Sequence, residues 1–225
     1  MATLLLRLAA PLQSWGADSK FETRKTNREP TKSGVIGLLA AALGLRRDQN
    51  DEIAKLARLR FGVRVDREGQ LLIDFHTAKM LVGNKSYITY RHYLQDAAFL
   101  VGLESDDMEL LRTLEDAITH PEYPLFLGRR SCPPTLPICI GIKDMDLTTS
   151  LEQEPKLCSN SGRADMHRII VEADSTEGGR GVQQDVPISF NPGHRQYGYR
   201  SVKEYMINLK KTMPAVTDHD PFYEL

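Results

Sequence analysis

The chain has 225 residues, of which 41% are hydrophobic and 26% charged, proportions that are ordinary for a soluble globular protein. Its net charge of −1 excludes a chain that is basic throughout, so any surface that binds nucleic acid must be local. The three cysteines (Cys132, Cys139 and Cys158) are odd in number and lack a CxxC spacing. They indicate neither a disulfide framework nor a zinc site, and they favour a cytoplasmic protein. The apolar run at the start is too short for a signal peptide or a membrane span.

The first predicted elements are a strand, a turn and a helix. Residues 3–9 form an apolar run that is typical of a buried strand, and residues 11–16 (PLQSWG) predict the turn after it. Apolar residues recur at helical spacing over residues 35–43, and either Thr31 or Ser33 can cap this helix.

The first turn of this helix is a candidate phosphate site. Its backbone N–H groups have no partner within the helix, and the helix dipole favours an anion there. Lys32 lies beside them, together with Ser33 and Gly34. These three residues are therefore predicted to hold a phosphate.

The rest of the chain alternates between short strands and short helices. The predicted elements are, in order, a helix (51–59), a hairpin (60–66 and 70–76), a polar loop (77–86), two strands (87–94 and 97–103), an amphipathic helix (106–119), a strand (136–142), a loop (143–165) and three strands (167–173, 185–190 and 203–209). This order predicts an α+β protein. Residues 1–142 are expected to form a ferredoxin-like domain with an inserted hairpin, and residues 143–225 a small β-rich region.

The most informative stretch is LGRRSCPP, at residues 127–134. Gly128 lets the backbone approach another molecule closely, and the guanidiniums of Arg129 and Arg130 match phosphate oxygens with a fork of donors. The two prolines exclude a regular helix or a central strand just beyond, so a fixed loop is expected. Taken alone, the arginine pair fits either a solvated turn or a contact with a nucleic-acid backbone.

Known catalytic motifs do not occur. The six histidines are spread along the chain without metal-ligand spacing, so no metal site is expected. There is no GxSxG, no Walker loop and no GxGxxG after a strand, so acyl transfer and nucleotide hydrolysis have no support. No cofactor is expected.

Aromatic and basic residues gather in the predicted inserted hairpin. Lys85, Tyr87, Tyr90 and His92 include the acid, base and cation that RNA cleavage without a metal requires. Such residues more often bind RNA by stacking and charge pairing, and a sheet face covered by tyrosines is a third interpretation. The run at 194–200 (HRQYGYR) also mixes cations and rings, and it fits either a second RNA surface or a solvated loop.

Several blocks of sequence resemble the signatures of one family. They are PLQSWG (11–16), PTKSGVIGLLAAALG (30–44), HTAKM (76–80), RHYLQDAAFLVGL (91–103), LGRRSCPP (127–134) and the later DVPISF…RQYGYR pattern. With these blocks in matching order, the chain resembles the CasD subunits of type I-E CRISPR Cascade complexes, within the RAMP superfamily. The resemblance implies a ferredoxin-like, RRM-related fold, a protruding hairpin "thumb" within about residues 77–92, and a smaller C-terminal β region.

The resemblance also implies a function. CasD subunits hold the 5′ handle of the CRISPR RNA, cap the backbone filament and contact the large subunit, and they meet target DNA only through the complex. Another subunit cleaves the precursor RNA, so a protein without catalytic activity is expected. The residues expected at the RNA are Gln13, Trp15, Arg24, Lys32, Ser33, Gly34, Arg91, Gly128, Arg129, Arg130, Ser131 and Cys132.

Two alternatives remain open from the sequence. One is a metal-independent endoribonuclease using His92 or His76 with Tyr90 and Lys85. A related branch from type I-C systems cleaves precursor RNA with a Tyr, Lys and His set, but these residues do not map onto its motif, so its activity is not carried over. The other alternative is a scaffold that mainly recruits the large subunit. Trp15, the only tryptophan, is equally an anchor for the core.

Overall fold

In a computed structural model of the whole chain, the residues described are 1–16, 22–79, 86–158, 166–173 and 181–209. Within them, seven strands pair antiparallel in one main sheet. In sheet order they are β10 (Gly181–Ser189), β11 (Gln196–Asn208), β9 (Met166–Glu172), β4 (Arg60–Arg67), β7 (Ala98–Ser105), β1 (Ala2–Ala9) and β8 (Cys139–Lys143). The predicted mixture of helices and sheet is confirmed, and the structure adds that the sheet pairing is mostly antiparallel.

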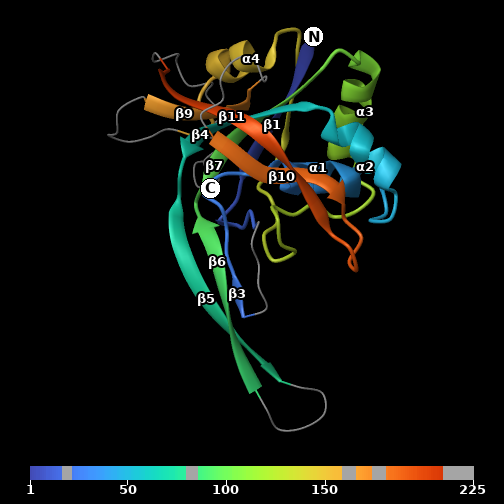
Figure 1. Cartoon of the computed structure of the whole chain (residues 1–225). Coiled ribbons are helices and arrows are strands. Elements are labelled where there is room, and N and C mark those ends of the chain that lie inside the picture. The colour runs from blue at the N-terminus through green and yellow to red at the C-terminus, as the bar shows by residue number, and fades with distance from the viewer. Residues whose placement is uncertain (17–21, 80–85, 159–165, 174–180, 210–225) are drawn as a thin grey trace, which may run out of the picture.

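Both faces of this sheet carry helices. The helices of the described residues are α1 (Lys32–Ala42), α2 (Asn50–Ala57), α3 (Met108–Thr119) and α4 (Leu147–Gln153). In Figure 1, α1, α2 and α3 lie together and α4 lies apart from them. Since successive strand residues point to opposite faces, Leu4 and Leu6 of β1 join the larger core with the first three helices, whereas Leu5 packs in a second cluster with Leu147 and Leu151 of α4.

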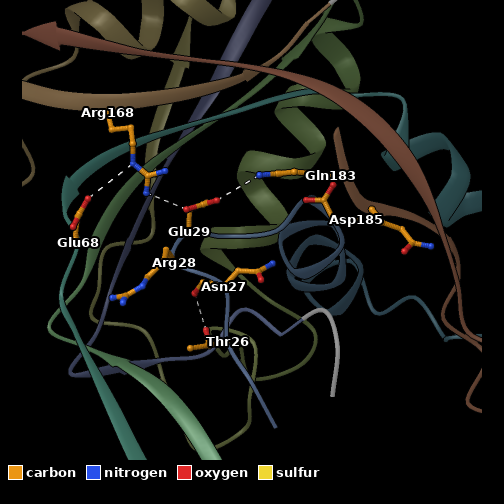
Figure 2. Close-up of a pocket in the computed structure, with 9 residues that line it drawn as sticks. Thr26, Asn27, Arg28, Glu29, Glu68, Arg168, Gln183 and Asp185 are labelled. Carbon is orange, nitrogen blue, oxygen red and sulfur yellow. Dashed lines mark hydrogen bonds and ion pairs between the residues drawn. The ribbon is translucent and has the colours of Figure 1, made fainter. Parts of the chain in front are cut away.

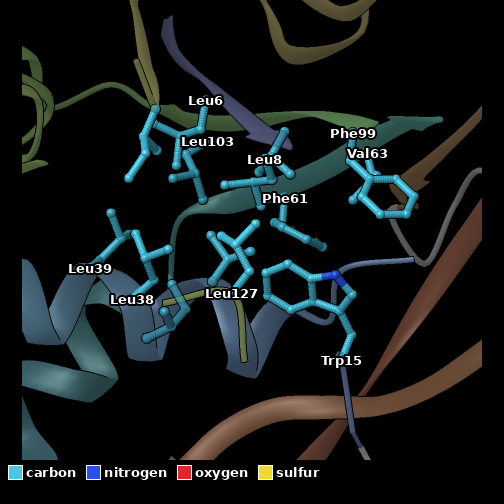
Figure 3. Packing of buried hydrophobic residues seen from close by; sticks show 14 of the residues in the cluster. Leu6, Leu8, Trp15, Leu38, Leu39, Phe61, Val63, Phe99, Leu103 and Leu127 are labelled. Carbon is cyan, nitrogen blue, oxygen red and sulfur yellow. The ribbon is translucent and has the colours of Figure 1, made fainter. Parts of the chain in front are cut away.

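The larger core joins α1 to the sheet and to two loops. Figure 3 shows Leu38 and Leu39 of α1 facing strand residues such as Leu6 and Leu103, with Trp15 and Leu127 packed beside them. Trp15 is 1% exposed and Leu127 is fully buried. The two loops that carry the PLQSWG and LGRRSCPP blocks therefore meet in the hydrophobic core.

Local residue types explain both ends of α1. The Thr31 side chain, and not that of Ser33, accepts the N–H of Gly34 as the N-cap. Gly44, whose φ is +73°, follows the helix in the left-handed conformation that glycine adopts without strain. Local capping and turn chemistry thus account for the bounds of this helix.

The predicted hairpin of residues 60–66 and 70–76 is wrong. β4 pairs with β7 and β9, whereas β5 (Gln70–Lys79) leaves the main sheet and pairs with β6 (Ser86–Gln95). At the corner, Gly69 has a φ of +71°, and an added Cβ would lie 2.5 Å from the carbonyl oxygen of Gln95. The strong turn signal therefore marks a change of sheet and not a hairpin turn.

The β5–β6 hairpin projects away from the body of the molecule (Figure 1). Two short strands, β2 (Leu12–Gln13) and β3 (Thr23–Arg24), pair with β6 near its base. The hairpin strands extend beyond the expected range of 77–92. The polar loop predicted over 77–86 is wrong at residues 77–79, which belong to β5, and at residue 86, where β6 begins. Residues 80–85, including Lys85, lie outside the described residues.

The C-terminal strands do not form a sheet of their own. β9 pairs with the edge of β4, so β9, β11 and β10 extend the main sheet. The expected boundary at 142/143 therefore does not divide two sheets. The loop predicted over 143–165 contains α4, which begins after Asp146, whose carboxylate accepts the N–H of Thr149. Among the described residues, no helix is both long and apolar enough to cross a membrane.

Candidate functional site

The LGRRSCPP loop is held in a tight turn against the PLQSWG loop. Gly128 has a φ of +85°, and a Cβ added there would lie 1.8 Å from the carbonyl oxygen of Ser14. The Ser14 N–H donates to Leu127 O at 3.1 Å, and the Cys132 N–H donates to Arg129 O at 2.9 Å. Only glycine fits this close approach. The loop therefore presents its two arginines from a fixed backbone.

Arg130 lines an open groove of about 790 Å³, which we call the arginine groove. Four arginines and one carboxylate line it, together with four aromatic rings and one side of α1. The arginines are Arg46, Arg47, Arg130 and Arg195, the acid is Asp48, and the rings belong to Tyr123, Phe126, Phe190 and Tyr197. The groove thus combines excess positive charge with rings on a chain whose net charge is −1.

Within the described part of the chain, carboxylates neutralise little of the positive charge of the groove. Arg46 pairs with Asp48 at 3.4 Å. Among the described residues, no carboxylate forms an ion pair with Arg47, Arg130 or Arg195. Guanidiniums bind phosphate oxygens in pairs of hydrogen bonds, and aromatic side chains stack on unpaired bases. The groove therefore suits a single-stranded nucleic acid.

The sequence predicted part of this groove and missed the rest. Ser33, Gly34, Gly128 and Arg130 were expected at the RNA and do line it. The aromatic and basic run at 194–200 contributes Arg195 and Tyr197 to the same groove. The LGRRSCPP loop and this run, which the sequence suggested as two separate surfaces, therefore line one groove. Arg46 and Arg47 were missed, although Gly44-Leu45-Arg46-Arg47 again places an arginine pair just after a glycine.

A second cleft, of about 770 Å³, has a different charge balance. Figure 2 shows Arg168 reaching Glu29 and Glu68 across it. Its Nη2 lies 3.0 Å from a Glu29 oxygen, and Glu204 and Glu68 also pair with this guanidinium. Two arginines face three carboxylates in the lining. This cleft is therefore not suited to a polyanion.

The predicted phosphate site at the start of α1 needs a correction. Lys32 is 3% exposed, its Nζ pairs with Glu172 at 2.7 Å, and its backbone N–H donates to Asp185 at 2.8 Å. Burial lowers the pKa of Lys32, and the Glu172 carboxylate opposes that shift. Two carboxylates of the protein thus occupy the place that was predicted for a phosphate, and the Lys32 side chain is a structural ion pair.

Three other predicted contact residues are interior residues. The Gln13 amide donates to Leu8 O and Ala97 O, and its oxygen accepts the indole N–H of Trp15 at 3.0 Å. Cys132 is 1% exposed, and burial raises the pKa of its thiol. The side chains of Gln13, Trp15 and Cys132 therefore hold the loops in place and are not exposed to solvent, which argues against the predicted contact with RNA.

Arg129 points to the base of the hairpin and does not line the groove. Its Nη2 donates to Arg24 O at 2.9 Å, and its guanidinium lies 4.8 Å from the centre of the Tyr93 ring. Arg24 of β3 pairs in register with Arg91 of β6. The structure therefore brings Arg24, Arg91 and Arg129 together, away from Arg130.

The structure brings together only some residues of the cleavage alternative, and Lys85 lies outside the described residues. Tyr90 and His92 share a face of the hairpin, opposite Phe75 and Ile73 of β5. His76 lies on the other face, where its Nε2 is 2.8 Å from Asp74. The described residues contain no group of three or more His, Cys, Asp or Glu side chains placed to hold a metal ion.

Comparison with known proteins identifies the family. Residues 3–203 match the model of a family described as CRISPR-associated protein (Cas_Cas5). The chain belongs to this Cas5 family. Over 159 residues it is 37% identical to the CRISPR system Cascade subunit CasD of Escherichia coli (strain K12), covering 61% of this chain and 70% of CasD.

Two solved structures of the same kind are similar over nearly the whole chain. One is a chain of a CRISPR RNA-guided surveillance complex, with 31% identity, a TM-score of 0.77, and coverage of 93% of this chain and 92% of that one. The other is described as a Cas protein, with 40% identity, a TM-score of 0.72, and coverage of 92% and 95%. The resemblance seen in the sequence blocks is thus confirmed, and it extends to the fold.

Proposed function

We propose that this Cas5 protein is the subunit of a cytoplasmic Cascade complex that binds the 5′ handle of the CRISPR RNA in the arginine groove. The observation that carries this proposal is that four arginines meet a single carboxylate in a groove lined with rings. The similar CasD protein is by name a Cascade subunit, and a similar solved chain belongs to an RNA-guided complex. Phosphates would contact the arginines and unstacked bases the rings.

Fluorescence anisotropy with labelled repeat RNA from the organism's own CRISPR array tests this proposal. We expect Arg130→Ala and Arg195→Ala each to weaken binding several-fold, because each removes a cation that faces the RNA. Arg112→Ala, at an exposed position of α3 that does not line the groove, is the matched control. Equal affinities for all three variants and the unaltered protein would exclude the groove as the RNA site.

The strand order supports a ferredoxin-like assignment for the first part of the chain. Leaving out the hairpin, the elements run β1, α1 and α2, β4, β7, α3, β8, and these strands stand side by side in the order β8-β1-β7-β4. We assign this unit to the ferredoxin-like class, with the β5–β6 hairpin inserted between its second and third strands as the thumb.

The exposed face of the hairpin supports the proposed place in a larger complex. Leu71, Ile73 and Phe75 of β5 share one face with Ile88 and Tyr90 of β6, and all five are exposed. Phe75, for example, is 66% exposed. An apolar surface of this kind on a projecting hairpin is typical of a contact with another molecule. We assign this apolar face as the contact with the neighbouring backbone subunit and the guide RNA. The large subunit would contact another face of the chain. Target DNA would be met only through the complex.

Co-purification of the complex from coexpressed subunits tests this partner assignment. We expect Phe75→Glu to reduce incorporation of the chain strongly while leaving its melting temperature unchanged, because the side chain is already in water. Val182→Glu is the control, since Val182 is equally exposed but lies on β10 in the main sheet. Normal incorporation of Phe75→Glu would refute the assignment.

The proposed role is binding without cleavage. His76 and Tyr90 lie on opposite hairpin faces, which argues against an endoribonuclease that uses His76. Tyr90 and His92 share a face, so the form that uses His92 is left to experiment. Incubation of the purified protein with labelled repeat RNA in EDTA separates the two functions. Cleavage that disappears in His92→Ala would establish the endoribonuclease instead.

A further inference from the structure

The two adjacent arginines of the LGRRSCPP loop have different surroundings. Arg130 is exposed and lines the arginine groove. Arg129 is partly buried, and its guanidinium lies against Tyr93 and the backbone of β3. Neighbouring residues with the same side chain therefore face different parts of the molecule.

We propose that Arg129 is a positioning residue that locks the base of the β5–β6 hairpin to the LGRRSCPP loop, while Arg130 makes the RNA contact. The second half of this inference rests on the proposed function of the arginine groove. The first half depends only on the contacts of Arg129 within the chain.

Arg129 connects three segments that are distant in sequence. Its Nη2 donates to the carbonyl of Arg24, in β3, at 2.9 Å. Its guanidinium lies over the ring of Tyr93, in β6, at 4.8 Å from the ring centre, a geometry that attracts the cation to the ring. Its own carbonyl closes the loop by accepting the N–H of Cys132. The side chain thus bridges the loop to both strands at the hairpin base.

The Tyr93 phenol reports on this arrangement. Tyr93 is 3% exposed. Burial opposes its ionisation, but hydrogen bonds with Ser131 and with the guanidiniums of Arg129 and Arg91 outweigh burial and lower its pKa. Among the described residues, no carboxylate pairs with Arg129 or Arg91. The ionisation of this buried phenol is therefore sensitive to the two guanidiniums beside it.

A second contact ties the hairpin to the same loops. The Ser14 hydroxyl donates to the carbonyl of His92 in β6, and Ser14 in turn packs on Gly128. With Arg129 on Tyr93, the hairpin base is attached to the loop at two points, and the next residue along the loop is Arg130. The orientation of the hairpin and the position of the RNA-facing guanidinium are therefore linked through a few short contacts.

The test compares Arg129→Ala, Arg129→Lys and Arg130→Ala in the full chain, after melting curves establish that each variant is folded. The first measurement is the dependence of repeat-RNA affinity on salt. The second is the pKa of Tyr93, from ¹³C NMR of protein labelled at tyrosine Cζ, with the resonance assigned by Tyr93→Phe. A merely structural loss of stability changes neither the salt slope nor the titration of a single phenol.

We expect Arg130→Ala to reduce the slope of log affinity against log salt by about 0.7, the value for one phosphate contact with a single strand. It should leave the pKa of Tyr93 unchanged. Arg129→Ala should raise the pKa of Tyr93 and weaken RNA binding several-fold without changing the slope. Arg129→Lys, which retains the charge, should restore part of the Tyr93 shift.

A reduced salt slope in Arg129→Ala, with Tyr93 titrating as in the unaltered protein, would overturn the positioning role. A different outcome would refute the proposed function and leave the positioning role intact. If RNA affinity is the same in all variants while Arg129→Ala still raises the pKa of Tyr93, the lock stands and the RNA assignment of Arg130 is wrong.

Discussion

Replacing Gly128 with alanine probes the close approach on which the candidate site is built. In the structure an alanine Cβ would lie 1.8 Å from the carbonyl oxygen of Ser14 and 2.8 Å from its carbonyl carbon. Both atoms belong to the backbone, so no side-chain rotation relieves the overlap. The residue also has a φ of +85°, which costs an L-amino acid roughly 1–2 kcal/mol. Forcing the loops apart adds about 1–3 kcal/mol, as for other overpacked sites.

Gly128→Ala is therefore expected to lower the free energy of unfolding by about 2–5 kcal/mol, the sum of these two costs. For a chain of this size each kcal/mol lowers the melting temperature by about 2–4 °C, so the decrease should be at least about 4 °C. Differential scanning calorimetry measures it directly.

Gly37→Ala is the matched control. Gly37 lies inside α1, and its added Cβ would meet only the Phe190 ring at 3.9 Å, an ordinary contact. Alanine is favoured over glycine in a helix by about 1 kcal/mol, so this variant should melt slightly higher. If Gly128→Ala melted at the same temperature as the unaltered protein, the close approach of the two loops would be disproved.

Three further substitutions or modifications probe other parts of the chain. Arg64→Met should cost about 3–5 kcal/mol in urea unfolding, because it removes the guanidinium that pairs with the buried Asp66 carboxylate; adding Asp66→Leu should recover part of this loss. Asp146→Ala removes the cap of α4 and should cost about 1 kcal/mol at pH 7. Hydrogen bonds from Thr149 lower the pKa of Asp146, so this contribution is present above its ordinary value of 3.8 and disappears as pH falls through the lowered value; a difference that persists in strong acid would contradict it. The Cys132 thiol should react with DTNB at pH 7 at least about tenfold more slowly than in urea, because it is buried and its pKa is raised; equal rates would mean that the loop opens freely.

Local patterns in the sequence predicted individual elements well where the residue types of a short segment determine its backbone conformation. The apolar run at 3–9, the helical spacing after Thr31 and the glycine at 128 each correspond to the predicted strand, helix and tight loop. The predictions failed where the structure depends on pairing between strands that are far apart in the sequence. Residues 67–69 have the composition of a hairpin turn, but β4 finds its partners in β7 and β9. Turn chemistry specifies a change of direction and not which strands lie on either side.

The same limit applies to the candidate site. Lysine and tryptophan are residue types that often contact RNA. In the fold, however, Lys32 pairs with Glu172 and donates to Asp185, and the Trp15 indole donates to Gln13. Only β9 and β10, joining the main sheet, bring the two carboxylates to the start of α1. No local pattern around Lys32 could have indicated these partners.

The sequence by itself determined that an arginine pair follows a glycine on a fixed loop, because φ preferences and side-chain chemistry are properties of single residues. The tertiary structure alone decided what each arginine does. Arg130 meets Arg46, Arg47 and Arg195 from distant segments in one groove, and Arg129 turns to Tyr93 at the hairpin base. Surroundings of this kind arise when the sheet, α1 and the hairpin pack together, since they depend on neighbours that lie far apart along the chain.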